Sequence, residues 1–213
     1  MPKFDHHIHT SRHSPDSILG PGELVDRARD VGLDGVVITE HDHQWDAAEL
    51  AELQRRAEGL VVLSGVEVST REGHFLVYGL PDLAECRPGM GLGELIPLVR
   101  RHDAAIVAAH PFRWDQDFDG IVREHGPAFD ALELVSNNVS PQTRRKTERL
   151  LAAHPRMGAT GSSDGHDPGP IGCYFTEFPG PIATIADFAA ALRDRTGRPG
   201  HRPGAPLAAG PLG

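Results

Sequence analysis

Short apolar runs alternate with amphipathic stretches along almost the whole chain. The apolar runs predict strands at 3–10, 34–40, 60–69, 74–80, 104–110, 130–135, around 157–161 and at 173–178. The amphipathic stretches predict helices at 21–29, 45–58, 92–102, 141–153 and 183–194. Because strands alternate with helices, the pattern predicts an α/β fold of parallel β-α units with helices covering the sheet.

The pattern changes at the end of the chain. Residues 197–213 are rich in proline and glycine, which predicts a disordered tail. The remaining residues, 1–196, are enough for one domain with a core, since the 213-residue chain is 39% hydrophobic.

Charge and composition limit the classes of binding partner and the cellular compartment that we expect for this protein. The net charge of −9 argues against a nucleic-acid scaffold held by a basic patch. The two cysteines, Cys86 and Cys173, form no CxxC pair, so we expect reduced thiols in a cytoplasmic protein. No apolar run approaches the roughly 20 residues of a membrane span, and the N-terminus does not resemble a signal peptide. The sequence leaves the oligomeric state open.

Histidines gather near the N-terminus, where DHHIHTSRHSPDS (5–17) holds four of the thirteen. Side chains two apart on a strand share a face, so His7 and His9 are expected to project together. The same spacing returns at Asp164 and His166. Two pairs from opposite ends of the chain meet only if the sheet closes or curls. This favours a TIM-barrel-like fold with the site at the C-terminal ends of the strands.

Further candidate site residues also lie next to the apolar runs that predict strands. His41, Glu67 and His110 lie at or near the end of an apolar run, whereas His74 opens one. Glu40 precedes His41 and should face the other way, so we expect it to orient a ligand imidazole rather than to bind metal.

Other histidines have ordinary explanations. His102, His125 and His154 follow helix-like segments and are expected in solvent, and His201 belongs to the tail. His13 fits either a ligand of a third ion or an exposed side chain.

The spaced pairs together with Glu67 predict a metal site, because burying so many polar groups unpaired would be costly. Imidazole and carboxylate ligands without thiolates fit Mn²⁺, Zn²⁺ or Fe²⁺. The candidates outnumber the ligands of one ion, so two or three ions are expected, with Glu67 as the natural bridge. Closely spaced ions suit phosphate-ester hydrolysis, because they activate a water and neutralise phosphoryl oxygens.

Nine short blocks, in order, resemble the motifs of the PHP (polymerase and histidinol phosphatase) domain family: DHHIHT, SPDS, ITEHD, GVEVS, GHFLVYG, AAHPF, LELVSN, GSSDGH and IGCYFT. The resemblance covers roughly residues 4–178 and is greatest to the small stand-alone phosphoesterase branch. Two positions depart from the family pattern: Glu40, usually aspartate there, and Gly165, often alanine.

This resemblance implies a distorted (β/α)₇ barrel with two or three metal ions at its C-terminal rim. Carried over residue by residue, it implies as ligands His7, His9, Asp16, His41, Glu67, His74, His110, Asp164 and His166.

The function expected from these features is hydrolysis of a small phosphate ester, such as a nucleotide or a histidinol-phosphate-like metabolite, by a metal-activated hydroxide. His110, His74 and Asp164 are the candidates for proton transfer, and Arg113 for orienting the substrate phosphate. The aromatic residues beside Arg113, Phe112 and Trp114, suit either the core or a stacking surface.

Two alternatives remain. Amidohydrolase-type carbon–nitrogen hydrolases also begin with His-x-His, and many bridge their metals with a modified lysine. The lysines here, Lys3 and Lys146, are misplaced for that role, although Glu67 could bridge instead. A non-catalytic, metal-bound regulatory domain is disfavoured, because such domains usually lose ligands and every position is filled.

Overall fold

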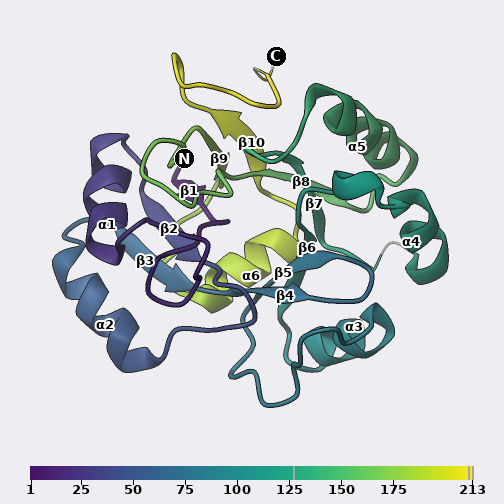
Figure 1. Cartoon of the computed structure of the whole chain (residues 1–213), viewed down its shortest axis with the longest axis horizontal. Coiled ribbons are helices and arrows are strands. Elements are labelled where there is room, and N and C mark those ends of the chain that lie inside the picture. Colours follow the sequence, from purple (N-terminus) through teal and green to yellow (C-terminus); the bar gives the residue numbers. More distant parts are fainter. Residues whose placement is uncertain (127, 211, 213) are drawn as a thin grey trace.

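The computed structural model describes residues 1–126, 128–210 and 212, which form two five-stranded sheets and the helices around them (Figure 1). The first sheet has the order β10-β9-β1-β2-β3, with β1 Lys3–Asp5, β2 Gly35–Ile38, β3 Val61–Ser64, β9 Tyr174–Glu177 and β10 Arg198–His201. The second has the order β4-β5-β6-β7-β8, with β4 Val66–Ser69, β5 His74–Tyr78, β6 Ala105–Ala108, β7 Ala131–Val135 and β8 Gly158–Gly161. The helices are α1 Pro21–Asp30, α2 Ala47–Arg56, α3 Leu92–Arg101, α4 Phe118–His125, α5 Pro141–Ala153 and α6 Ile185–Arg193, with a 3₁₀ turn at Arg113–Asp115.

Each sheet carries helices on its outer face (Figure 1). Helices α1 and α2 pack on the first sheet, where Leu24 and Leu53 meet Val36 and Ile38. Helices α3 to α5 flank the second sheet in the same way. Val37, between Val36 and Ile38, belongs instead to the interior cluster, as the alternation of side chains along a strand requires. The outer layers are therefore ordinary helix-on-sheet cores.

Helix α6 closes one end of the interior and lies in the middle of the molecule in Figure 1. Its Phe188 packs against Phe4 and Tyr78, at ring-centroid distances of 5.7 and 4.9 Å. The interior is thus filled with apolar side chains near α6, and polar groups are gathered elsewhere in it.

The expected α/β class is confirmed, but the strands of the expected distorted (β/α)₇ barrel do not close into one barrel and instead form two sheets. The single strand expected over 60–69 is divided at Gly65, and β3 and β4 belong to different sheets. A Cβ at Gly65 would lie 2.7 Å from the Tyr78 ring and 2.8 Å from the Val77 carbonyl, so this close approach requires glycine. Isolated bridges between His41 and Glu67 and between Ile8 and Gly165 hold the two sheets together at the rim.

The strands are also less uniformly parallel than expected. Strand β5 runs antiparallel to β4 and β6, and β9 runs antiparallel to β1 and β10. The turn between β4 and β5 is too short for a crossover helix, which forces a hairpin. Arg198–His201, expected in the disordered tail, pair with β9 as β10. No helix among the described residues is both long and apolar enough to span a bilayer.

Candidate metal centre

Glu67, on β4, is buried in the middle of five histidines. Its Oε2 atom lies 3.4 Å from His7 Nε2, 3.2 Å from His9 Nε2 and 3.0 Å from His41 Nδ1. Its Oε1 atom lies 3.0 Å from His74 Nδ1 and 3.4 Å from His110 Nε2. Strand ends from both sheets therefore converge on one carboxylate.

Asp164 supplies a second carboxylate to the same group. Its Oδ1 atom lies 3.3 Å from His7 Nε2 and 3.6 Å from His9 Nε2. Its Oδ2 atom accepts a hydrogen bond of 2.6 Å from Asn138 Nδ2 and lies 3.9 Å from His110 Nε2. Asp164 and Glu67 thus face the His7 and His9 rings together.

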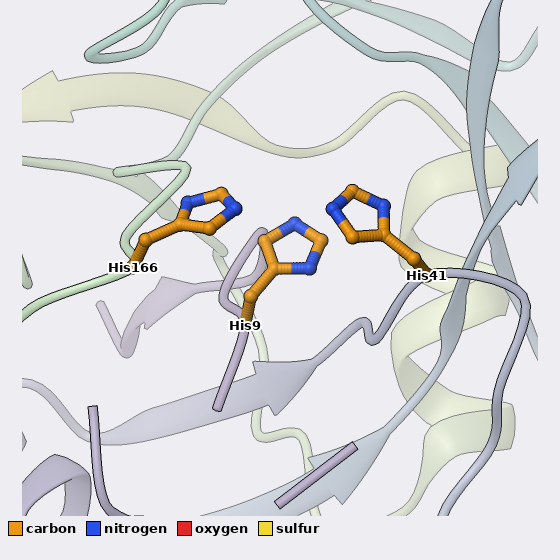
Figure 2. Close-up of side chains that lie close together, drawn as sticks. All are labelled: His9, His41 and His166. Atoms are coloured by element: carbon orange, nitrogen blue, oxygen red, sulfur yellow. The ribbon is translucent and has the colours of Figure 1, made fainter. Parts of the chain in front are cut away.

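The outer part of the site is more open. The His9 ring stacks with both His41 and His166, with ring centroids 4.2 and 4.3 Å away, and the His41 and His166 centroids lie 6.0 Å apart (Figure 2). Asp16 Oδ2 lies 3.1 Å from His41 Nε2 and 3.3 Å from His166 Nε2. The Asp16 side chain is 53% exposed, against 2% for Asp164, so the site runs from the protein interior to the solvent.

We call these residues the principal cluster: His7, His9, Asp16, His41, Glu67, His74, His110, Asp164 and His166. All nine candidate ligands are therefore brought together, as the spacing and the resemblance require. Within the cluster, four overlapping triads each have ligand atoms within 4.8 Å of one another: His7–Glu67–His110, His7–His9–Asp164, His9–His41–His166 and His41–Glu67–His74. Because neighbouring triads share members, the arrangement suits more than one ion.

Two buried nitrogens, His7 Nε2 and His9 Nε2, have no hydrogen-bond partner. Each nevertheless lies within 3.6 Å of the carboxylates of Glu67 and Asp164. Leaving such atoms unpaired in the interior is costly, and a cation between rings and carboxylates removes that cost. The nitrogen and oxygen donors fit Mn²⁺, Zn²⁺ or Fe²⁺.

The carboxylates and imidazoles also shift one another's pKa. Burial alone would lower the pKa of His7, but the negative charges of Asp164, Glu133 and Glu67 raise it well above its usual value. Burial would likewise lower the pKa of His41, yet Glu67 and Asp16 raise it to about 9. A metal ion entering the site therefore competes with protons.

Glu133, on β7, was not identified from the sequence. Its Oε1 atom accepts hydrogen bonds from His7 Nδ1 (3.0 Å) and Ser162 Oγ (2.5 Å), and its Oε2 atom accepts one from the His110 backbone N–H (2.8 Å). Because Glu133 holds Nδ1, His7 Nε2 is the nitrogen that faces the carboxylates of Glu67 and Asp164, and it becomes available to a metal ion once its proton leaves. The available signal was an acidic residue inside the apolar run ALELV.

Glu40 lies beside the cluster and contacts it indirectly. It accepts hydrogen bonds from Thr10 Oγ1 (2.5 Å), Ser14 Oγ (2.6 Å) and Trp45 Nε1 (3.0 Å). Ser14 Oγ in turn lies 3.4 Å from His9 Nδ1. Glu40 therefore supports the outer side of His9 through a hydroxyl group.

The loop after β6 carries Arg113 to the rim of the cluster. Arg113 Nη1 lies 3.8 Å from Asp164 Oδ2, and its guanidinium stacks on Trp114 at 4.1 Å. Phe112 is buried in the core, whereas Trp114 is 69% exposed. His110, Phe112 and Trp114 have φ angles of 29°, 67° and 53°, an unusual run for non-glycine residues and typical of a functional site.

A cavity of about 230 Å³ opens beside this loop. His74 and His110 of the principal cluster form one part of its wall, and Arg113 and Trp114 form another. A molecule in the cavity would therefore touch both the cluster and the Arg113 guanidinium.

Comparison with known proteins agrees with this arrangement. Residues 5–155 match the PHP domain family, and residues 144–196 match the PHP-associated family. Uncharacterized protein MJ1587 of Methanocaldococcus jannaschii is 27% identical over 138 residues, which cover 56% of this chain and 79% of that protein.

Two solved structures share the fold at low sequence identity. A two-domain protein from Bacteroides vulgatus, described as containing a predicted PHP-like metal-dependent phosphoesterase, superposes with a TM-score of 0.72 at 19% identity. The match covers 94% of this chain but 65% of that one. An amidohydrolase from Chromobacterium violaceum, solved with bound sulfate, has a TM-score of 0.63 at 20% identity, over 78% of this chain and 88% of that one. Since the family match spans most of the sequence, this chain belongs to the PHP domain family.

Proposed function

We propose that this protein is a metal-dependent phosphoesterase that hydrolyses a phosphate ester of a small molecule. The observation that carries the proposal is the pair of buried, unpartnered nitrogens, His7 Nε2 and His9 Nε2, facing the carboxylates of Glu67 and Asp164. Divalent ions held by the principal cluster would supply Lewis acidity toward phosphoryl oxygens and would lower the pKa of a coordinated water. Family membership supports the same class of reaction.

The chain's own residues complete the site. Arg113 offers a fork of N–H donors to a phosphate group in the neighbouring cavity. His110 and His74 line the same cavity, where either can donate a proton to the departing alkoxide. Asp164, 3.8 Å from Arg113 Nη1, keeps the guanidinium turned toward the cluster.

A second candidate is hydrolysis of a carbon–nitrogen bond, which the shared fold with the Chromobacterium violaceum amidohydrolase keeps open. The lysines argue against the lysine-bridged form of that chemistry. Lys3 Nζ lies over the Phe175 ring and Lys146 Nζ over the Phe112 ring. Each ammonium group therefore contacts an aromatic ring and is not placed to bridge metal ions beside Glu67. Glu67 as the bridge remains compatible with either reaction.

The deciding experiment measures phosphate release from a panel of phosphomonoesters and phosphodiesters by the full chain reconstituted with Mn²⁺, Zn²⁺ or Fe²⁺. Metal-dependent turnover that a chelator abolishes, and that His9→Ala lacks, supports the proposal. Absence of release from every ester, combined with hydrolysis of an amide or cyclic-amide panel by the same preparation, would establish the carbon–nitrogen alternative instead.

A further inference from the structure

A second group of ligand-type side chains lies outside the principal cluster. It consists of His13, in the loop after β1, His43, in the loop after β2, and Glu49, in the first turn of α2. One ligand atom from each residue lies within 4.8 Å of the other two. We call this group the outer triad.

The outer triad is built by local structure rather than by chance approach of long side chains. Asp46 caps α2 by accepting hydrogen bonds from the Ala48 and Glu49 N–H groups, which fixes where the helix begins. Glu49 then points at His13, with Oε2 3.1 Å from Nε2. The His13 and His43 rings stack with centroids 3.9 Å apart, so both imidazoles are held beside the carboxylate.

An ordinary polar network explains only part of this geometry. Glu49 already has a charged partner, since Arg12 approaches Oε1 at 2.6 Å through Nε and at 2.5 Å through Nη2. Arg12 therefore uses one carboxylate oxygen and leaves Oε2 turned toward His13. A carboxylate that is hydrogen-bonded through one oxygen and presents the other to an imidazole is the usual arrangement of a metal ligand and its support.

We propose that His13, His43 and Glu49 bind a divalent transition-metal ion, best Zn²⁺, at a site separate from the principal cluster. Two imidazoles and one carboxylate are a common three-ligand zinc set, with water completing a tetrahedron. Ligand atoms around tetrahedral zinc at bond lengths of about 2.1 Å lie about 3.4 Å apart, and the ligand atoms of the outer triad lie within 4.8 Å of one another.

An ion there ties together two loops that serve the principal cluster. His13 lies in the loop that also carries Asp16, and His43 follows His41 by two residues. The outer triad thus joins both loops to α2 beside the exposed edge of the principal cluster. This inference concerns metal binding by these three side chains and does not depend on the proposed phosphoesterase activity.

The test is equilibrium dialysis of the full chain against Zn²⁺, with bound zinc counted by elemental analysis. The double variant His13→Gln/His43→Gln is expected to bind one ion fewer per chain than the unchanged protein and to keep the ions of the principal cluster. Glu49→Gln should lower the affinity for that ion more than tenfold. Glu52→Gln removes an exposed carboxylate from the same helix, where it pairs with Arg55, and should change nothing.

Equal zinc counts in the double variant and the unchanged protein would overturn the proposal. Loss of all bound zinc in the double variant would do so as well, because the site would then be inseparable from the principal cluster. Should the double variant fail to fold, the single variant His43→Gln gives the same count. Visible absorption of the Co²⁺-loaded chain provides a second readout, since losing a tetrahedral site lowers the band intensity.

Discussion

His6 and His7 are neighbours in the sequence and both are fully buried, but their surroundings are opposite. His6 Nδ1 lies 2.7 Å from the Tyr78 hydroxyl and Nε2 lies 3.1 Å from the Thr176 hydroxyl. Burial lowers the pKa of His6 to about 4, so its ring stays neutral. His7 faces three carboxylates, which raise its pKa well above the usual value.

The difference distinguishes two parts of the same protein interior. His6 lies next to Phe188 of α6, where apolar side chains fill the space and hydroxyl groups satisfy both ring nitrogens. His7 lies where Glu67, Glu133 and Asp164 meet, and its Nε2 has no hydrogen-bond partner. What the second ring nitrogen faces, and not burial itself, therefore distinguishes the two histidines and makes His7 the candidate metal ligand.

The largest expected effect comes from removing the carboxylate shared by the five histidines. Glu67→Gln should abolish metal binding at the inner part of the principal cluster and reduce kcat/KM on the order of 10³-fold, because the lost Lewis acidity amounts to several kcal/mol. Metal content and steady-state turnover measure this. Glu58→Gln, which changes an exposed carboxylate after α2, is the matched control. Full metal content in Glu67→Gln would remove Glu67 from the site.

Glu133→Gln tests the support behind His7. The amide keeps the size of the side chain but removes the charge that holds His7 Nδ1 as a donor. Metal affinity should fall about 10- to 100-fold, as for other residues that orient metal ligands. Turnover at saturating metal should recover most of the loss, which distinguishes a positioning residue from one that touches substrate. A variant with normal metal affinity would show that His7 is oriented by other means.

His6→Leu should affect stability and leave the metals in place. The substitution removes the ring that joins the Tyr78 and Thr176 hydroxyls, and the free energy of unfolding should fall by about 1–3 kcal/mol. Urea unfolding and metal analysis of the same preparation measure both quantities. Loss of metal without loss of stability would place His6 in the cluster and erase the contrast with His7.

The His7 side of this contrast could be predicted from the sequence. The spacing of His7 and His9, repeated at Asp164 and His166, predicted that these two segments meet, and in the structure Asp164 lies beside His7 and His9. The pattern was informative because ligands alternate with apolar residues such as Ile8, which packs under α1 and α2. His6 carried no such signal, and only its contacts with Tyr78 and Thr176 reveal its role.

The parts that could not be predicted depend on contacts distant in the sequence. The division at Gly65 follows from the approach of Tyr78, which no local pattern reveals. Glu133 resembled any acidic residue in a strand until β7 placed it against His7. The run Arg198–His201 looks disordered by composition, yet β9 offers a free edge with which it pairs.

The smallest expected effect is a pH dependence of stability in the metal-free protein that distinguishes His41, in the principal cluster, from His6, in the apolar part of the interior. His41 has a pKa of about 9 in the fold against 6.5 when unfolded, so its contribution to the free energy of unfolding is complete below pH 6.5 and is lost as the pH rises through 9. His6, with a pKa of about 4, contributes fully above pH 6.5 and loses that contribution as the pH falls through 4. Urea unfolding between pH 4 and 9 should therefore show His41→Gln reducing the alkaline decline and His6→Leu the acid decline. An alkaline decline reduced by His6→Leu, or an acid decline reduced by His41→Gln, would contradict the comparison. Bound metal should suppress only the alkaline decline, because metal-bound His41 is held neutral at every pH where the ion stays bound.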